Sequence, residues 1–162
     1  MRHLRRALLA GVAVALCASS VAAAVFAARA SATPPATLIT TYNVASQVPT
    51  SARTAGANTF VTITETATFT GGMTGEATGT ERFLFRRDGS SVLHLRATCV
   101  CSLAGRTGTL EFRVQGGGGS EGASGTIGGT GSDGLKGLHL NGTWRLVGPG
   151  VVAVSARYHF DG

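Results

Sequence analysis

The sequence predicts an all-β protein, an eight-stranded antiparallel β-barrel, and three observations lead to this prediction. From Thr37 onward, segments in which apolar and polar residues alternate are separated by short glycine-rich breaks, as in strands with one buried and one solvated face. Glycine and threonine are abundant and there is a single lysine, a composition that favours strands and turns over helices. Beyond the N-terminal region, no stretch has the periodicity of a helix.

The first thirty residues are expected to be a secretory signal peptide rather than part of the fold. Three arginines lie within the first six residues, and an uncharged stretch rich in Ala, Val and Leu follows over 7–28. Ala28-Arg29-Ala30 fits the small-x-small cleavage pattern, and Ala30-Ser31-Ala32 is a second choice. The uncharged stretch exceeds the roughly 7 to 15 residues of a usual signal core, so an uncleaved membrane anchor is the alternative. We expect a secreted or extracytoplasmic protein that contacts a membrane only if this segment is uncleaved.

Charge excludes nucleic acid as an expected partner once the signal is set aside. Four of the 14 basic residues, and none of the 8 acidic ones, lie before residue 31, so the remainder carries a net charge of only +2. A high isoelectric point therefore describes the export signal rather than a nucleic-acid-binding surface. About 130 residues remain, enough for one domain with one core.

The strands are expected in order along that domain, which begins near residue 37. An N-terminal strand and loop occupy 31–57, with the loop over 46–57, and 58–162 forms the remainder of the barrel. The expected strands are 37–46, 58–69, 76–87, 90–100, 107–115, 120–129, 137–147 and 150–160. The turns between them contain glycine, and Asp88-Gly89 is a strong hairpin signal.

The segment 58–69 shows the pattern most clearly, because every second residue from Val61 to Phe69 is apolar except Glu65, and threonines fill the alternate positions. Eight strands of this kind close into a barrel, which removes exposed edges and leaves an interior for packed side chains or one small ligand. A two-sheet β-sandwich would satisfy the same alternation and is the alternative architecture.

Half of the residues over 116–137 are glycine, and Gly129 to Gly134 fit the G-x-G-x-x-G pattern of a dinucleotide-binding turn. Such a turn needs a helix after it and an acidic residue about twenty positions later. The residues after Gly134 alternate and are interrupted by further glycines, and the acidic residue is missing. We therefore interpret these glycines as turns, bulges and close approaches in a curved barrel wall, and expect no cofactor.

Four stretches occur in an order that resembles a known family. They are FTGGMTGEATGT (69–80), LAGRTGTLEF (103–112), GTGSDGLKGL (129–138) and the closing YHFDG (158–162). The chain resembles a family of uncharacterised bacterial proteins catalogued as domain of unknown function 3224. The resemblance implies a barrel similar to that of allene oxide cyclase, itself related in shape to lipocalins. It implies no agreed activity and supplies no catalytic residues. The export signal, the Cys-Val-Cys segment before Leu103 and the loosely matching 37–57 depart from the family pattern.

Two carboxylates are candidate catalytic residues because alternation places them on apolar faces, Glu65 beside Ile63 and Ala67, and Glu81 beside Phe83. A carboxyl group in an apolar lumen has a raised pKa, which suits proton transfer. The alternative is a position near a strand end or bulge, where each would reach water or an arginine.

Six aromatic residues are expected to face the interior and form the candidate ligand site: Phe69, Phe83, Phe85, Phe112, Trp144 and Tyr158. A ligand pocket and a simply filled barrel are both compatible with them, and the filled barrel is the commoner outcome.

Cys99 and Cys101 are the two cysteines beyond the signal. Residues two apart on a strand share a face, with Cα atoms about 6.5 Å apart, near the upper limit for a disulfide. A bridge is therefore expected only where the chain bulges, and two unlinked side chains on one face are the favoured interpretation. His94, His139 and His159 fall on exposed faces without metal-site spacing, so no metal site is expected.

The sequence thus favours an exported barrel without established enzymatic activity that binds a small apolar molecule in its lumen. An isomerase or cyclase using Glu65 or Glu81 is one alternative. A structural or oligomer-forming envelope protein with a filled barrel is another, and in either case a homo-oligomer is compatible with the sequence.

Overall fold

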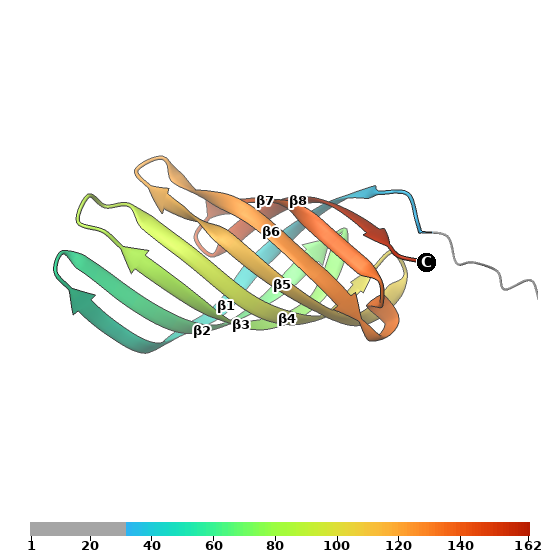
Figure 1. The fold of residues 1–162 in the computed structure, drawn as a ribbon, viewed down its shortest axis with the longest axis horizontal. Coiled ribbons are helices and arrows are strands. Elements are labelled where there is room, and N and C mark those ends of the chain that lie inside the picture. Colours follow the sequence, from blue (N-terminus) through green and yellow to red (C-terminus); the bar gives the residue numbers. More distant parts are fainter. Residues whose placement is uncertain (1–31) are drawn as a thin grey trace, which may run out of the picture.

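The computed structural model describes residues 32–162, and the predicted signal peptide over 1–30, with its first cleavage site after Ala30, lies outside the described residues. Eight antiparallel strands follow one another around a closed barrel, in which each strand pairs with its neighbours in sequence and the last pairs with the first (Figure 1). The prediction of an eight-stranded antiparallel barrel is confirmed. Within residues 32–162, no helix is long and apolar enough to cross a bilayer.

The strands are long and joined by tight connections. Their bounds are β1 (Ala36–Ala55), β2 (Asn58–Gly71), β3 (Met73–Phe85), β4 (Ser91–Leu103), β5 (Arg106–Gly119), β6 (Gly122–Ser132), β7 (Leu138–Gly148) and β8 (Val151–Phe160). One 3₁₀ turn, η1 (Asp133–Leu135), connects β6 to β7.

The loop expected over 46–57 was wrong, because β1 continues to Ala55 and pairs with β2 along this length. Pairing between β1 and β8 ends at Asn43, so beyond that point β1 has one neighbour only. The resulting β1–β2 arm projects from the barrel end (Figure 1), and its residues from Ala45 to Gly56 are exposed. Apart from Gln47, which reaches back to the lumen, the side chains of this part of β1 meet water, so the apolar half of the alternating pattern is missing there.

The interior of the barrel is densely packed at the end where the described chain begins and ends. Leu135 of η1 is fully buried and lies with Leu103, Leu138 and Phe160 in the core cluster of the described chain. The turn η1 thus inserts one leucine beneath the ring of strands. This end of the lumen is closed by side chains.

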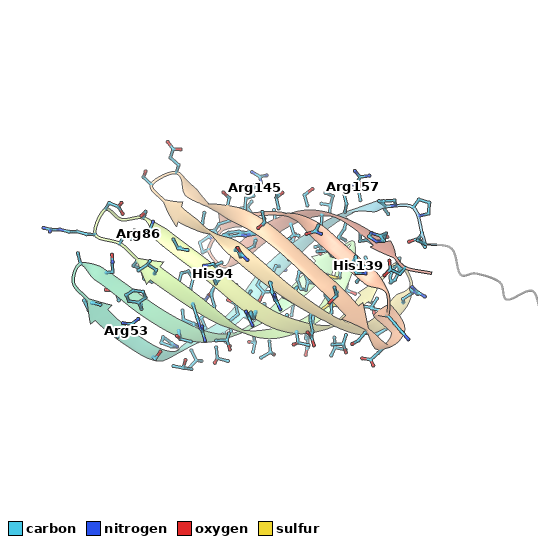
Figure 2. All side chains as sticks on the ribbon, viewed as in Figure 1. Arg53, Arg86, His94, His139, Arg145 and Arg157 are labelled. Atoms are coloured by element: carbon cyan, nitrogen blue, oxygen red, sulfur yellow. A yellow bond between two sulfur atoms is a disulfide. The ribbon has the colours of Figure 1, made fainter. Side chains whose placement is uncertain are left out.

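The outer surface carries the polar half of each strand. On β2 the residues that alternate with the core are threonines, and Thr64, Thr66 and Thr68 are exposed. The arginine and histidine side chains labelled in Figure 2 lie on the outer face or in the hairpins, and none of them lines the lumen cavity described below. Among residues 32–162, no lysine, arginine or histidine lines this cavity.

Candidate functional site

The lumen contains a cavity of about 290 Å³. It lies between the packed end and the opposite end of the barrel, where the β1–β2, β3–β4 and β5–β6 hairpins are (the hairpin end). Its volume lies near the lower end of the range of small-molecule sites, roughly 300 to 1,000 Å³. Its walls come from every strand and are mostly apolar. They are Tyr42, Val44, Gln47, Glu65, Phe69, Glu81, Phe83, Leu93, Leu95, Phe112, Val114, Ala123, Ile127, Trp144, Leu146, Gly150, Val152 and Val154.

Three aromatic rings form the floor of this cavity. The centroid of Tyr42 lies 4.9 Å from that of Phe69 and 6.2 Å from that of Phe112, and the Phe69 and Phe112 centroids are 5.5 Å apart. All three residues are at most 6% exposed. Tilted and edge-on pairs at these distances are favourable beyond the burial of area alone. The wall toward the hairpins is more open, since Phe83 and Leu93 are half-buried and Leu146 is 46% exposed.

A polar cluster interrupts the apolar wall where β1, β2 and β3 meet. Glu65 and Glu81 are 2% and 5% exposed, which confirms that alternation turns both carboxyl groups inward. The Tyr42 hydroxyl donates to Glu65 Oε1 at 2.6 Å. The Gln47 amide Nε2 donates to Glu65 Oε2 at 2.9 Å and to Glu81 Oε2 at 3.1 Å. One amide thus links the two carboxyl groups.

A β-bulge in β1 brings Gln47 into this cluster. The register of β1 against β2 runs from Val44–Ala67 to Ser46–Thr66, so Ala45 is an extra residue. An unbulged strand that begins with Tyr42 and Val44 inward would turn the even-numbered residues inward and Gln47 outward. The extra residue reverses this parity and places Gln47 opposite Glu65.

Burial and like charge raise the pKa values of two groups in this cluster, Glu81 and Tyr42. Burial is the main reason, and the charge of neighbouring Glu65 the second, that the pKa of Glu81 rises from its ordinary value of 4.5 to about 8, against the lowering effect of the Gln47 hydrogen bond. Burial and then the Glu65 charge also raise the pKa of the Tyr42 hydroxyl well above its usual range. Near neutral pH the Glu81 carboxyl group therefore holds a proton and Tyr42 stays neutral. The cluster offers both proton donors and carboxylate acceptors.

The structure places the sequence-predicted aromatic residues in different surroundings. Phe69, Phe83, Phe112 and Trp144 line the cavity. The other two do not. Phe85 is 43% exposed and stacks on Phe83 with a centroid distance of 5.3 Å, beyond the barrel wall. Tyr158 is half-buried at the packed end, edge-on to Phe160.

Glycine pairs in β5 and β6 make room for Trp144. Gly116 and Gly125 face one another across the two strands, and a Cβ on either would overlap the Trp144 indole and the opposing backbone. The indole Nε1 donates to the carbonyl oxygen of Gln115 at 3.1 Å. These glycines permit close approach in the barrel wall, and the G-x-G-x-x-G segment over 129–134 runs from β6 into η1.

Sequence reasoning missed Tyr42 and Gln47. Tyr42 follows Leu38 and Thr40 in strict alternation, which was a usable signal for an inward side chain. Gln47 gave no such signal because its inward position depends on the bulge at Ala45.

Cys99 and Cys101 are fully buried and joined in a disulfide with a Cα–Cα distance of 5.4 Å. The favoured interpretation of two unlinked side chains differs from this arrangement. The expectation that a bridge requires a bulge was also wrong, since β4 pairs with β3 and β5 without a register shift at these residues. The bridge faces the packed end of the lumen.

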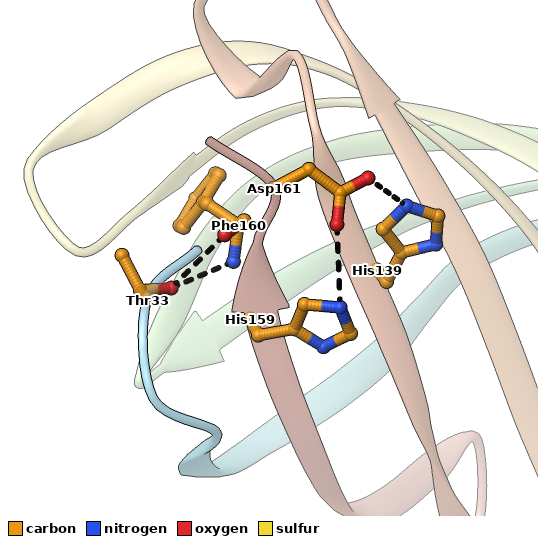
Figure 3. Close-up of polar contacts among 5 residues, drawn as sticks. All are labelled: Thr33, His139, His159, Phe160 and Asp161. Carbon is orange, nitrogen blue, oxygen red and sulfur yellow. Dashed lines mark hydrogen bonds and ion pairs between the residues drawn. The ribbon is translucent and has the colours of Figure 1, made fainter. Parts of the chain in front are cut away.

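An outer cluster ties together the two ends of the described chain (Figure 3). His139 Nε2 lies 2.8 Å and His159 Nε2 3.5 Å from the two carboxylate oxygens of Asp161, and the imidazole rings stack with centroids 5.2 Å apart. The Thr33 hydroxyl accepts a hydrogen bond from the Phe160 backbone nitrogen at 2.7 Å. Within residues 32–162, no group of three or more His, Cys, Asp or Glu residues is arranged to hold a metal. These contacts hold the end of the C-terminal strand β8 against β7 and against Thr33.

Fold and site together define a closed eight-stranded barrel with a partly filled lumen and a buried acidic cluster. A solved structure with this fold is that of a protein with unknown function of the DUF3224 family from Shewanella oneidensis MR-1. The two chains superpose with a TM-score of 0.69 over 80% of this chain and 99% of that chain, at 16% sequence identity. At this identity the likeness shows a shared fold, in agreement with the family that the motifs resemble. No family model and no curated protein matches the chain.

Proposed function

We propose that the protein is an exported member of the DUF3224 family that binds a small, largely apolar molecule in its lumen. The cavity of about 290 Å³ carries this proposal, because four aromatic rings named from the sequence line it together with aliphatic side chains. Concave apolar pockets with a few convergent polar groups are the usual form of small-molecule sites. The same cavity argues against the filled-barrel alternative.

Native mass spectrometry of the protein purified from its own host tests this proposal. Val152 lines the cavity and is half-buried, so Val152→Phe would direct a larger side chain into the free space. Val100 is 65% exposed on the outer face of β4, and Val100→Phe is the matched control. We expect a bound molecule on the wild type and on V100F and its loss from V152F. Bare protein in all three, or equal adducts on all three, would contradict lumen binding.

A proton-transfer activity is a second candidate, favoured by one observation. Glu81 holds a proton near neutral pH while hydrogen-bonded through Gln47 to Glu65, so the pair can divide the roles of acid and base. Such a pair suits an isomerase or cyclase acting on the bound molecule. Once a ligand is known, E65Q and E81Q test this candidate. Loss of turnover with binding retained supports it, and unchanged turnover in both variants overturns it.

Export is proposed from the sequence alone. Cleavage after Ala30 would leave a chain that begins at Ser31, and cleavage after Ala32 one that begins at Thr33. Both products retain the Thr33 contacts with Phe160. The intact mass of the protein recovered from its host distinguishes these products from an uncleaved, membrane-anchored chain.

A further inference from the structure

The lumen cavity carries an imbalance of charge. Its described lining includes two carboxyl groups, on Glu65 and Glu81, and no lysine, arginine or histidine. The remaining polar partners are the neutral Tyr42 hydroxyl and Gln47 amide. Burying carboxylates without a counter-ion is costly, and hydrogen bonds offset only part of that cost. The site is therefore complementary to a positive charge that this part of the chain does not itself provide.

One oxygen atom of Glu81 has no nitrogen donor as a partner. Oε2 accepts from Gln47, whereas no N–H group of residues 32–162 donates to Oε1, and the carboxyl groups of Glu81 and Glu65 also interact by a hydrogen bond. In the same residues every fully buried side-chain oxygen or nitrogen has a partner, so Oε1 must retain some accessible surface. Because Glu81 is only 5% exposed and lines the cavity, that surface faces the cavity.

The aromatic walls add a second attraction for cations. Five aromatic residues share the cavity with the carboxyl pair, namely Tyr42, Phe69, Phe83, Phe112 and Trp144. Ring faces attract ammonium groups, more strongly where water is excluded. Apolar rings around two buried carboxyl groups suit a molecule with one cationic end and an apolar body.

We propose that the lumen binds a protonated organic amine, with its ammonium group at Glu65 and Glu81 and its apolar part against the aromatic rings. This inference rests on the proposed lumen binding and names the chemical class of the ligand. The cavity volume limits the amine to a small one, about the size of a phenylalkylamine.

Binding of an amine would be linked to the proton on Glu81. The titratable groups that line the cavity are Tyr42, Glu65 and Glu81. With a pKa of about 8, Glu81 is protonated in the empty site at pH 6. An ammonium group favours the charged carboxylate, so binding releases the proton and the affinity increases as the pH rises toward 8. A neutral ligand of equal shape lacks this dependence.

The single tryptophan, Trp144, reports on the site directly because it lines the cavity. Its fluorescence is titrated with 2-phenylethylamine and with 2-phenylethanol, which have the same number of non-hydrogen atoms, at pH 6 and at pH 8.5. We expect the amine to bind at least about tenfold more tightly than the alcohol at pH 8.5, with the advantage much reduced at pH 6. Calorimetry of the amine in two buffers should show release of about one proton at pH 7.

The outcomes separate this inference from the proposed function. Alcohol binding equal to or tighter than amine binding at pH 8.5 overturns the amine inference and leaves lumen binding intact. No change in Trp144 emission with either compound, and no heat on titration, contradicts both.

Substitution of Glu81 provides an independent test of the amine inference. Glu81→Gln should abolish the pH dependence and most of the preference for the amine, while the affinity for the alcohol stays within about twofold. Glu111 is exposed on β5, outside the cavity, and Glu111→Gln is the matched control with wild-type behaviour. An unchanged amine preference in E81Q contradicts the inference. If E81Q does not fold, the wild-type comparison of the two compounds at two pH values decides.

Discussion

Glu81 shows how burial in the lumen changes the protonation of a single carboxyl group. Its alternating position in β3 places it among Phe83, Leu95 and Gly79 of the wall, and burial there favours the neutral carboxyl group. A group of this kind does not strengthen the fold at high pH. Because the folded protein holds this proton more tightly than the unfolded chain does, the contribution of Glu81 to stability is largest at low pH and is lost as the pH rises through its folded pKa.

The stability of the protein should therefore decrease as the pH rises from 5 to 9. The folded pKa of Glu81, about 8, exceeds its ordinary value of 4.5, so the folded state binds more protons in this window. In E81Q this contribution is absent. We expect the denaturant midpoint of the wild type to fall relative to that of E81Q between pH 5 and 9, with most of the fall complete by pH 8. Parallel pH profiles for the two proteins would contradict the raised pKa.

The disulfide between Cys99 and Cys101 makes a second prediction at the scale of residues. Because the bridge closes a loop of minimal length, its entropic effect on the unfolded chain is small, about 1 to 2 kcal/mol. Intact mass before and after reduction should reveal the bridge in protein exported to an oxidising compartment. Reduction should leave the fold intact and lower the free energy of unfolding by that amount. Unfolding on reduction, or free thiols in the exported protein, would contradict this prediction.

Individual site residues were predictable only where alternation was regular. Glu65 and Phe69 are the fifth and ninth residues of the unbroken pattern that begins at Val61 in β2, and both face inward as expected. Phe85 follows the same parity but lies at the hairpin end, where no opposing wall covers it. Parity fixes the direction of a side chain, and the height along the barrel decides whether it is buried.

At the scale of elements, β1 and the glycine-rich strands show what a local pattern can and cannot reveal. Residues 46–57 contain no alternating apolar residues, because this part of β1 is exposed beyond the barrel, and the continuation of the predicted 37–46 strand was therefore missed. A strand was predicted over 120–129 despite the glycines, and β6 runs from Gly122 to Ser132 with Ala123 and Ile127 on its inner face. The bulge at Ala45 depends on the pairing with β2 and has no local signature.

The glycines of β5 and β6 should differ sharply in their tolerance of a side chain. In Gly125→Ala the new Cβ would overlap the carbonyl oxygen of Gln115 and the Trp144 indole. We expect this variant to lose about 1 to 3 kcal/mol of stability or more, as in other overpacked sites. Gly119→Ala is the control, because nothing lies within 4 Å of its added Cβ. Denaturant melts monitored through Trp144 compare the two. Equal stability would contradict the close approach at Gly125.

At the scale of the whole molecule, the sequence favoured a closed barrel over a two-sheet sandwich, but it did not predict the state of the lumen. Eight alternating segments with short turns predict the ring of strands. Whether the ring is filled depends on how side chains from all eight strands divide one volume, as Leu135 and Phe160 fill one end while Phe83 and Leu93 leave the other open. The packing of the lumen therefore cannot be predicted from any single strand.

Nuclear Overhauser contacts between 2-phenylethanol and the protein would show whether a small molecule enters the lumen. The compound is neutral, so the result does not depend on the charge of the Glu65–Glu81 pair. We predict contacts from its ring protons to Trp144, Phe112 and Ile127, which line the cavity, and their loss in V152F. Contacts restricted to exposed residues such as Val100 and Ile39, or no contacts at all, would contradict the account.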